Sequence, residues 1–250
     1  MDFTNKVVIV TGASSGIGAS SAILFAKYGA QLTLVGRDEN RLGIVAKQCL
    51  QANGLQPLCI LIDLTGKGAC ETVITKTIDT YKQIDVLVNC AGKMLIASLF
   101  DDTTDVFDEL IDINLRVPYK LTHLAVPHLV KTKGNIVNVN TTRNSRVRHG
   151  FLAFAITKAG LERFTKSAAV ELSTEGVRIN SVQPGLTRTN ILKNLAMTEE
   201  EVKKTYDALS SKMNILEADE VANMVVFMAS EACPNLNGAH FGIDGGQTLI

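Results

Sequence analysis

The chain has 250 residues, which is enough for one sizeable hydrophobic core and typical of a single α/β domain. Lys plus Arg and Asp plus Glu both number 25, so the net charge gives no reason to expect nucleic acid or an anionic membrane as a partner. We expect a cytoplasmic protein without disulfides, a metal site or a membrane segment, because the five cysteines lack a C-x-x-C pair, the four histidines lack ligand spacing, and no secretory signal or apolar run of ~20 residues is visible.

Short apolar runs alternate with longer amphipathic stretches along the chain. Seven runs are aliphatic or β-branched on both faces and end in a turn signal, which predicts strands at 6–12, 31–37, 58–64, 84–92, 134–140, 177–185 and 240–246. Helical patterns separate them at 17–29, 38–53, 66–82, 103–131, 152–175, 190–212 and 217–230. This alternation implies right-handed βαβ crossovers and one doubly wound parallel sheet flanked by helices.

The first strand leads into the glycine-rich stretch "TGASSGIG", which precedes a helix. Its three glycines allow a tight turn and a close backbone approach to a phosphate. The new helix then directs its free N–H groups and its positive dipole end at a pyrophosphate. The succession of strand, turn and helix therefore predicts a dinucleotide site. The candidate binding residues of this turn are Gly12, Ser14, Ser15, Gly16, Ile17 and Gly18.

With this turn in place, the chain resembles the short-chain dehydrogenase/reductase family over almost its whole length. The motifs that carry the resemblance stand in the family's order and spacing: "TGASSGIG" (11–18), "NCAG" (89–92), "IN" (113–114), "NVNT" (138–141), the lysine at 158, "PG" (184–185) and "IDGG" (243–246). Several motifs in register are far more specific than any one of them. The resemblance implies a single Rossmann-like domain over 1–250, a nicotinamide cofactor and a small-molecule substrate. It also implies a homo-oligomer, a tetramer or a dimer, with closed symmetry.

The end of the second strand bears on the choice of cofactor. An acid in this place bonds the ribose 2′-hydroxyl of NAD, whereas an arginine suits the 2′-phosphate of NADP. The sequence has Gly36, Arg37 and Asp38 here, and a guanidinium matches a phosphate with paired hydrogen bonds. We therefore expect NADP(H) to be favoured over NAD(H). In the alternative, Arg37 is a solvated surface charge and Asp38 takes the ribose.

The resemblance implies further cofactor contacts along the chain. Asp63 and Leu64 would border the adenine, and Ala91 and Gly92 would line the cofactor groove. Asn89 would line the groove as well, or it would hold neighbouring strands together. The residues that would flank the nicotinamide carboxamide are Pro184, Gly185, Thr187 and Thr189.

The catalytic segment departs from the family's pattern. In the family a tyrosine exchanges the proton of the substrate oxygen, and a lysine four positions later lowers the tyrosine pKa and binds the nicotinamide ribose. A serine thirteen positions before the tyrosine bonds the same oxygen, and an asparagine helps to hold a proton-relay water. Here Asn114, Thr141 and Lys158 match the asparagine, serine and lysine, but Phe154 stands at the tyrosine position. Phenylalanine has no ionisable group, so it cannot act as a general acid or base.

Two further segments would border the substrate. Arg146, Arg148 and His149 crowd one short loop, which is either solvated or a basic rim that recruits an anionic substrate. By resemblance, a mobile lid at about 186–215 folds over the substrate. Its Tyr206 is a candidate for the pocket wall and is equally suited to ordinary packing.

These residues leave three functions open. The first is an NADP(H)-dependent oxidoreductase that acts on a small carbonyl or alcohol, with proton transfer impaired or altered by Phe154. The second is a catalytically inactive nucleotide-binding protein or partner subunit, which Phe154 alone suggests. The third is a different reaction in the same cleft that uses Lys158 or His149 for proton abstraction.

Overall fold

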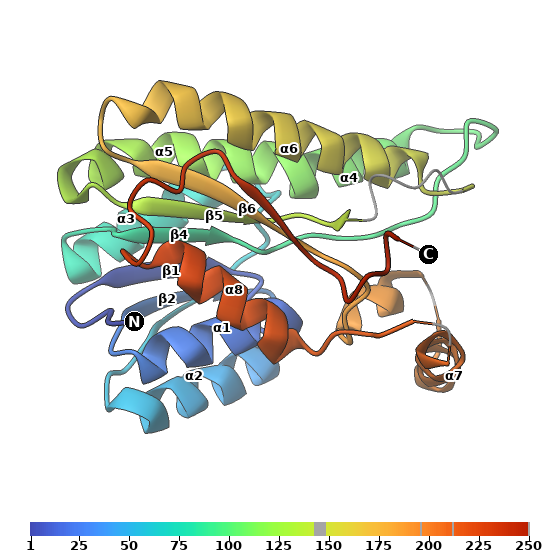
Figure 1. The fold of residues 1–250 in the computed structure, drawn as a ribbon, viewed down its shortest axis with the longest axis horizontal. Coiled ribbons are helices and arrows are strands. Elements are labelled where there is room, and N and C mark those ends of the chain that lie inside the picture. The colour runs from blue at the N-terminus through green and yellow to red at the C-terminus, as the bar shows by residue number, and fades with distance from the viewer. Residues whose placement is uncertain (143–148, 196, 212, 250) are drawn as a thin grey trace.

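A seven-stranded parallel sheet forms the centre of the protein (Figure 1). The structure, a computed structural model of the chain, describes residues 1–142, 149–195, 197–211 and 213–249. The strands lie in the order β3-β2-β1-β4-β5-β6-β7, and each neighbouring pair is parallel. The predicted doubly wound sheet is thus confirmed. The strand bounds are β1 Val7–Thr11, β2 Gln31–Gly36, β3 Leu58–Leu61, β4 Val86–Asn89, β5 Asn135–Val139, β6 Arg178–Pro184 and β7 His240–Ile243.

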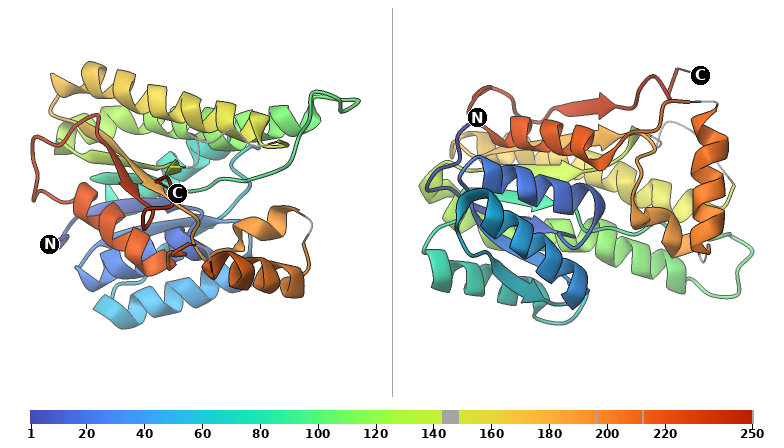
Figure 2. Two further views of the ribbon diagram at one scale, coloured as in Figure 1. Left: turned by 45° about the vertical axis from the view of Figure 1, so that its right-hand side comes forward. Right: turned by 90° about the horizontal axis from the view of Figure 1, so that it is seen from below.

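Helices cover both faces of the sheet (Figures 1 and 2). On one face lie α1 Gly16–Lys27, α2 Glu39–Asn53 and α8 Ala218–Ala229. On the other lie α3 Ala69–Tyr81, α4 Asp105–Ile111, α5 Val117–Thr132 and α6 Leu152–Ser173. The helix α7 Glu199–Ser210 stands apart from both layers, beyond the carboxyl ends of the strands. None of the helices in the described part of the chain combines the length and the apolar character that crossing a bilayer requires.

The central strand shows why two layers form. The side chains of β1 alternate between the two faces of the sheet. Val8 and Val10 belong to the core under α1 and α8, whereas Ile9 belongs to the core under α3 and α5. All three side chains are fully buried. A strand that is apolar on both faces therefore requires a helical layer on each.

Two helical predictions need correction. The stretch 103–131, predicted as one helix, contains a π-helical segment at Asp112–Arg116 between α4 and α5. Such π-segments insert a residue into a helix and are frequent at functional sites. The stretch 190–212, also predicted as one helix, divides into a 3₁₀ segment at Asn190–Leu195 and α7. The division has a local cause, because Thr198 and Glu201 form a capping box that starts a new helix.

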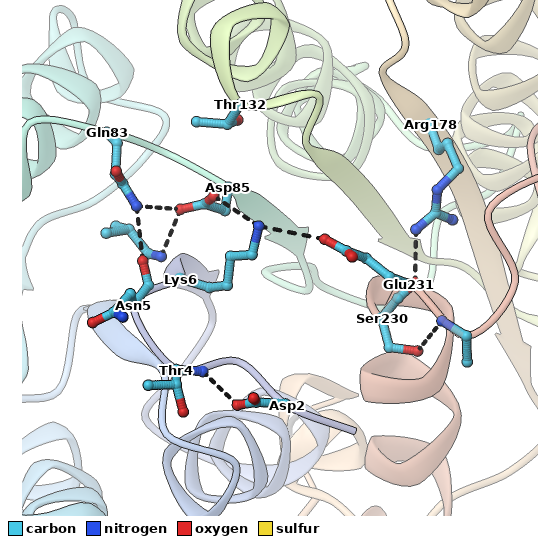
Figure 3. A network of polar contacts seen from close by, with 12 residues as sticks. Asp2, Thr4, Asn5, Lys6, Gln83, Asp85, Thr132, Arg178, Ser230 and Glu231 are labelled. Atoms are coloured by element: carbon cyan, nitrogen blue, oxygen red, sulfur yellow. Dashed lines mark hydrogen bonds and ion pairs between the residues drawn. The ribbon is translucent and has the colours of Figure 1, made fainter.

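A polar network closes the sheet at the amino ends of its strands (Figure 3). The buried carboxylate of Asp85 accepts hydrogen bonds from the Val7 N–H at 2.8 Å and from the Gln83 amide at 2.9 Å. The Lys6 ammonium lies 3.5 Å from Asp85 and 3.4 Å from Glu231. These contacts join the starts of neighbouring strands. Ligands of open α/β sheets bind at the opposite edge, outside the carboxyl ends of the strands.

Candidate active site

The turn between β1 and α1 lies where the strand order reverses, between β1 and β4. Gly12 has a φ of 67°, and a Cβ atom on it would lie 3.0 Å from the backbone of Ala91. A Cβ atom on Gly18 would lie 2.4 Å from the carbonyl oxygen of Gly12, so glycine is needed for α1 to pack against the turn. Within the described chain Ser15 makes no side-chain capping bond, which leaves the first N–H groups of α1 available to an anion.

Thr11 joins the ends of β1 and β4. Its hydroxyl donates to the Val88 carbonyl at 3.1 Å and accepts from the N–H groups of Cys90 at 3.0 Å and Ala91 at 3.1 Å. The segment after β4 is therefore held against the glycine turn. This contact places Ala91 and Gly92 beside Gly12.

A cavity of about 880 Å³ extends from this turn along the carboxyl ends of the strands to the segment after β6. Most of the predicted site residues line it. They are Gly12, Ser14, Ser15, Gly16, Ile17, Arg37, Asp63, Leu64, Ala91, Gly92, Thr141, Phe154, Lys158, Pro184, Gly185, Thr187 and Thr189. Five other predicted site residues do not line the cavity that the described residues form. They are Gly18, Asn89, Asn114, His149 and Tyr206.

Two ion pairs lie at the end of the cavity formed by β2. The Arg37 guanidinium lies 3.2 Å from the Asp63 carboxylate, and Arg41 Nε lies 2.8 Å from Asp38. Burial raises the pKa of Asp63, but hydrogen bonds from Thr65 and the contact with Arg37 outweigh it and lower that pKa below its usual value. The backbone N–H of Arg41, donating to Asp38, lowers the pKa of Asp38 in the same way. This end of the cavity thus carries two cations, each beside a carboxylate.

At the opposite end, α6 presents Lys158 and Phe154 one turn apart. Lys158 is 8% exposed, and its ammonium donates to the Val139 carbonyl at 3.0 Å. Burial lowers the Lys158 pKa to about 8, while the nearby Cys90 acts in the opposite direction. The Phe154 ring is 9% exposed and packs in an apolar cluster with Leu110. The third residue, Thr141, follows β5 and donates its hydroxyl proton to the Pro184 carbonyl at 3.2 Å.

Asn114 stands behind this end of the cavity, within the π-helical segment. Its side chain is 1% exposed and is bonded on both sides to the backbone of Lys93. The oxygen accepts from the Lys93 N–H at 2.9 Å, and the amide donates to the Lys93 carbonyl at 2.9 Å. It also donates to the Thr157 hydroxyl at 3.3 Å. In this structure Asn114 therefore positions the segment after β4, next to Gly92.

Asn89 lies inside the sheet, at the end of β4. Its amide donates to the Asn138 side-chain oxygen at 2.9 Å and to the Thr122 hydroxyl at 3.4 Å. Asn138 in turn donates to the Thr165 hydroxyl at 2.9 Å. These bonds join β4, β5, α5 and α6, and they match the structural alternative for Asn89.

Tyr206 anchors the segment after β6 from behind. Its hydroxyl donates to the carbonyls of Thr187 at 3.0 Å and Thr189 at 3.2 Å, and it accepts from the Thr189 N–H at 3.3 Å. The Tyr206 hydroxyl therefore makes its hydrogen bonds to backbone groups, and the residue does not line the cavity that the described residues form. Gln247 supports the same segment, because its side chain accepts from the Leu186 N–H at 2.7 Å and donates to the Asn214 carbonyl at 2.6 Å.

The proposed basic rim is described in part. Arg146 and Arg148 lie outside the described residues. His149 is exposed and does not line the cavity that the described residues form. Within those residues, no three His, Cys, Asp or Glu side chains gather in a group that could hold a metal ion.

The cavity lining also contains polar residues that the sequence analysis does not name, among them Cys90, Asn140 and Arg41. Cys90 and Asn140 both lie within the quoted motifs, between positions with an assigned role, and that placement is the signal that could have found them. Arg41 follows Asp38 by three positions, which places both on one face of α2. Asn140 donates to the Lys158 carbonyl at 3.1 Å, while its buried side-chain oxygen has no hydrogen-bond partner among the described residues.

The chemistry of this lining suits a dinucleotide. The glycine turn offers close backbone approach and free N–H groups, as a pyrophosphate requires. Lys158 supplies a buried cation, and the unpartnered Asn140 oxygen supplies an acceptor at the same end. Arg37 and Arg41 supply cations at the other end.

Comparison with known proteins places the chain in a family. Residues 12–248 match the family model described as enoyl-(acyl carrier protein) reductase. The chain is 32% identical over 253 residues to the 3-oxoacyl-(acyl-carrier-protein) reductase FabG of Thermotoga maritima, with 100% of both chains covered. It is 29% identical over 248 residues to the meso-2,3-butanediol dehydrogenase of Serratia marcescens, covering 99% of this chain and 96% of that one.

The fold agrees with a solved structure from Caenorhabditis elegans, a short-chain dehydrogenase/reductase of unknown function with cofactor. The TM-score is 0.94 at 32% identity, with 99% of this chain and 97% of that chain covered. An oxidoreductase family that uses a nicotinamide cofactor is thus matched in sequence and in fold. The chain belongs to the short-chain dehydrogenase/reductase family.

Proposed function

We propose that this chain is an NADP(H)-dependent oxidoreductase that acts on a small carbonyl or alcohol substrate, with proton transfer impaired or altered by Phe154. The observation that carries the proposal is the position of Lys158. Its buried ammonium lines the same cavity as the glycine turn and has the Phe154 ring beside it. One cavity thus combines a phosphate-binding turn with a cation at the reacting end.

A bound nicotinamide supplies or accepts the hydride, and the chain supplies binding and orientation. The N–H groups after Gly12 bind the pyrophosphate, and Lys158 binds the ribose next to the reactive ring. The segment from Pro184 to Thr189 lies against the carboxamide. Tyr206 supports that role, because its hydroxyl fixes two carbonyls of this segment.

The preference for NADP(H) rests on the end of β2. Arg37 and Arg41 both line the cavity there, and two guanidinium groups match a 2′-phosphate. Asp38 would have to bind the ribose hydroxyl of NAD. Its carboxylate already accepts from the Arg41 N–H at 2.9 Å and from Arg41 Nε at 2.8 Å. The ion pair with Arg41 thus offsets the negative charge that Asp38 would present to a 2′-phosphate, which supports the proposed preference.

The substrate oxygen lies beside Thr141 and Lys158 in this proposal, because both line the reacting end of the cavity. The Thr141 hydroxyl can donate or accept a hydrogen bond, and Lys158 has a pKa lowered to about 8 by burial, so it can exchange a proton near neutral pH. In this proposal neither Thr141 nor Lys158 is as effective a general acid as a positioned phenol. The loss of a positioned general acid typically lowers the rate by ~10²–10⁴.

The second candidate is a catalytically inactive, nucleotide-binding member of the family or a partner subunit. Phe154 favours it, because the ring is part of an apolar cluster with Leu110 and Ala153 and offers no proton. The cofactor framework alone does not separate the two candidates.

Assembly and compartment belong to the same proposal. Tyr119 on α5 is 57% exposed and Val170 on α6 is 75% exposed, so these long helices present apolar surface outward. We propose a homotetramer or dimer formed through α5 and α6, which Val170→Glu should dissociate in light scattering after size-exclusion chromatography. The five free cysteines support the cytoplasm as the compartment. The segment 186–215 acts as a lid over the substrate.

The test begins by titrating the protein with NADPH and with NADH. The fluorescence of the reduced nicotinamide reports the binding. The unaltered protein is then incubated with NADPH and a panel of carbonyl compounds, and loss of absorbance of the reduced nicotinamide is recorded. Turnover supports the oxidoreductase. Tight NADPH binding without turnover supports the inactive candidate. A protein that binds neither dinucleotide contradicts both.

A further inference from the structure

The part of the cavity beyond Lys158 has largely apolar walls. Met94 follows β4, Phe154 lies on α6, and the opposite side is formed by the lid residues Leu195, Met197 and Leu209. These side chains come from three separate segments of the chain and meet around one space. Figure 2 shows α7, which carries Leu209, at the open end of the sheet.

Met94 joins the two apolar clusters that build these walls. It packs against the lid cluster that contains Leu192 and Val202, and also against the α6 cluster that contains Phe154. The apolar surface is therefore continuous from the lid to the Phe154 ring. Methionine is unbranched and polarisable, so Met94 and Met197 can adapt to ligands of different shape.

Charges are scarce at this end of the cavity. Among the described lining residues beyond the β2 end, the charged side chains are Lys93 and Lys158. Lys93 forms an ion pair with Glu109, and Lys158 donates to the Val139 carbonyl. The other polar groups toward the lid are uncharged: Thr141 and Asn140 near Lys158, and Thr187, Thr189, Asn190, Asn194 and Thr205 in the segment after β6.

We propose that this part of the cavity takes an uncharged ketone, or the corresponding alcohol, with an extended apolar body. The inference rests on the proposed function, because Thr141 and Lys158 hold the oxygen of the substrate. The hydrocarbon body lies against Met94, Phe154 and the lid. An organic acid would lose the hydration of its carboxylate against the apolar walls, where Lys93 is already paired with Glu109, and that loss opposes its binding.

The inference is tested by binding in a complex that cannot react. The NADP⁺-loaded protein is titrated calorimetrically with 2-butanone, 2-hexanone, 2-octanone and 2-decanone, because a ketone and an oxidised cofactor do not exchange a hydride. We expect the Kd to fall about tenfold for each two methylenes until the space is filled. The matched anion is 5-oxohexanoate, which has the carbon number and carbonyl position of 2-hexanone. It should bind at least about tenfold more weakly than 2-hexanone.

Substitutions on the two walls locate the effect. Met94→Gln and Leu209→Asn place an amide on opposite sides of the cavity at similar volume. Each should raise the Kd of 2-octanone about tenfold or more and leave that of 2-butanone within about twofold. The control is Ile44→Gln, at an exposed apolar residue of α2 outside the cavity lining, which should change neither.

The two ideas fail separately. A Kd independent of ketone length, or tighter binding of 5-oxohexanoate than of 2-hexanone, overturns the apolar substrate and leaves the proposed function standing. The second result would point to the basic segment that contains Arg146 and Arg148. A protein that does not bind NADP⁺ overturns the proposed function and, with it, the inference. The length series uses the unaltered chain, so it decides the question even if a variant fails to fold.

Discussion

The Lys158 ammonium lies 5.9 Å from the centroid of the Phe154 ring, one helical turn away on α6. This distance is within the range of a cation–π contact, which stabilises a desolvated ammonium without offering a proton. The resemblance described above would place the family's catalytic tyrosine and lysine on this same turn. The Phe154 ring therefore contacts the Lys158 ammonium but can act neither as an acid nor as a base.

Restoring a phenol at this position should raise activity. In Phe154→Tyr we expect kcat/KM for a carbonyl substrate to rise by about 10²–10⁴, because the hydroxyl would lie beside Lys158 and act as general acid. Steady-state oxidation of NADPH measures the change. Phe154→Leu is the control, since it removes the ring without adding a proton donor. Equal activity in the tyrosine variant and the unaltered protein would contradict the role given to the missing hydroxyl.

The buried ammonium of Lys158 should make stability depend on pH. The lysine pKa falls from 10.5 to about 8 on folding, so between these values the unfolded chain holds more protons than the folded one. The contribution of Lys158 to the free energy of unfolding is therefore least favourable below about pH 8 and improves as the pH rises toward 10.5, by roughly 3 kcal/mol in total.

Lys158→Met is the reference for this effect. Urea unfolding of both proteins without cofactor gives the difference in their free energies of unfolding. That difference should favour the methionine variant most near neutral pH and shrink by about 2.5 kcal/mol toward about pH 10. Parallel curves for the two proteins would contradict the lowered pKa.

Cofactor preference should change with Arg37. Because hydrogen bonds to a charged group contribute about 1.5–3 kcal/mol, Arg37→Ala should raise the NADPH Kd about tenfold or more. The NADH Kd should change less than about twofold, because NADH lacks the 2′-phosphate. Asp38→Ala is the matched variant and should leave NADPH binding in place. A larger loss of NADH than of NADPH binding in Asp38→Ala would instead assign the ribose to Asp38.

Asn89 should matter for stability rather than for the cofactor. Asn89→Ala removes the bond to Asn138 within the sheet and leaves a buried oxygen without its donor, at a cost of about 1–3 kcal/mol in the free energy of unfolding. The NADPH Kd should stay within about twofold. Denaturation and fluorescence titration of one preparation give both quantities. If the variant is as stable as the unaltered protein but binds NADPH much more weakly, the structural role is contradicted and Asn89 contacts the cofactor.

Tyr206 should hold the lid by its hydroxyl. Tyr206→Phe leaves the Thr187 carbonyl and the Thr189 backbone without their partner, so the free energy of unfolding should fall by about 1–3 kcal/mol. Amide hydrogen exchange in 186–195 should become faster than in the unaltered protein. Tyr28→Phe is the control and should cost less than about 0.5 kcal/mol, because the hydroxyl of this half-buried tyrosine has no hydrogen-bond partner among the described residues. Unchanged amide exchange in 186–195 would contradict the prediction that the Tyr206 hydroxyl stabilises this segment.

The seven strands and their parallel order follow from patterns that are local in sequence. An apolar run such as β1 buries both faces, and a glycine turn such as that at Gly12 needs a backbone that other residues rarely adopt. The interruption at Asp112–Arg116 leaves no mark in the sequence, because the apolar period continues through it, and the bonds of Asn114 to the Lys93 backbone join residues 21 positions apart. The helical pattern over 190–212 does not show the break at Thr198, although the capping residues Thr198 and Glu201 are visible in the chain.

By itself, the sequence determined the chemistry available at each position: the glycine turn, the lysine at 158, and, four residues before it, a phenylalanine that offers no proton. Tertiary structure decided which of these groups share a space. It turned Asn89 and Tyr206 toward internal partners, and it brought Met94 and Leu209 together on opposite sides of one cavity. The physical reason is that hydrogen bonding and apolar packing act between residues far apart in the chain, and no local pattern records which partner each side chain meets.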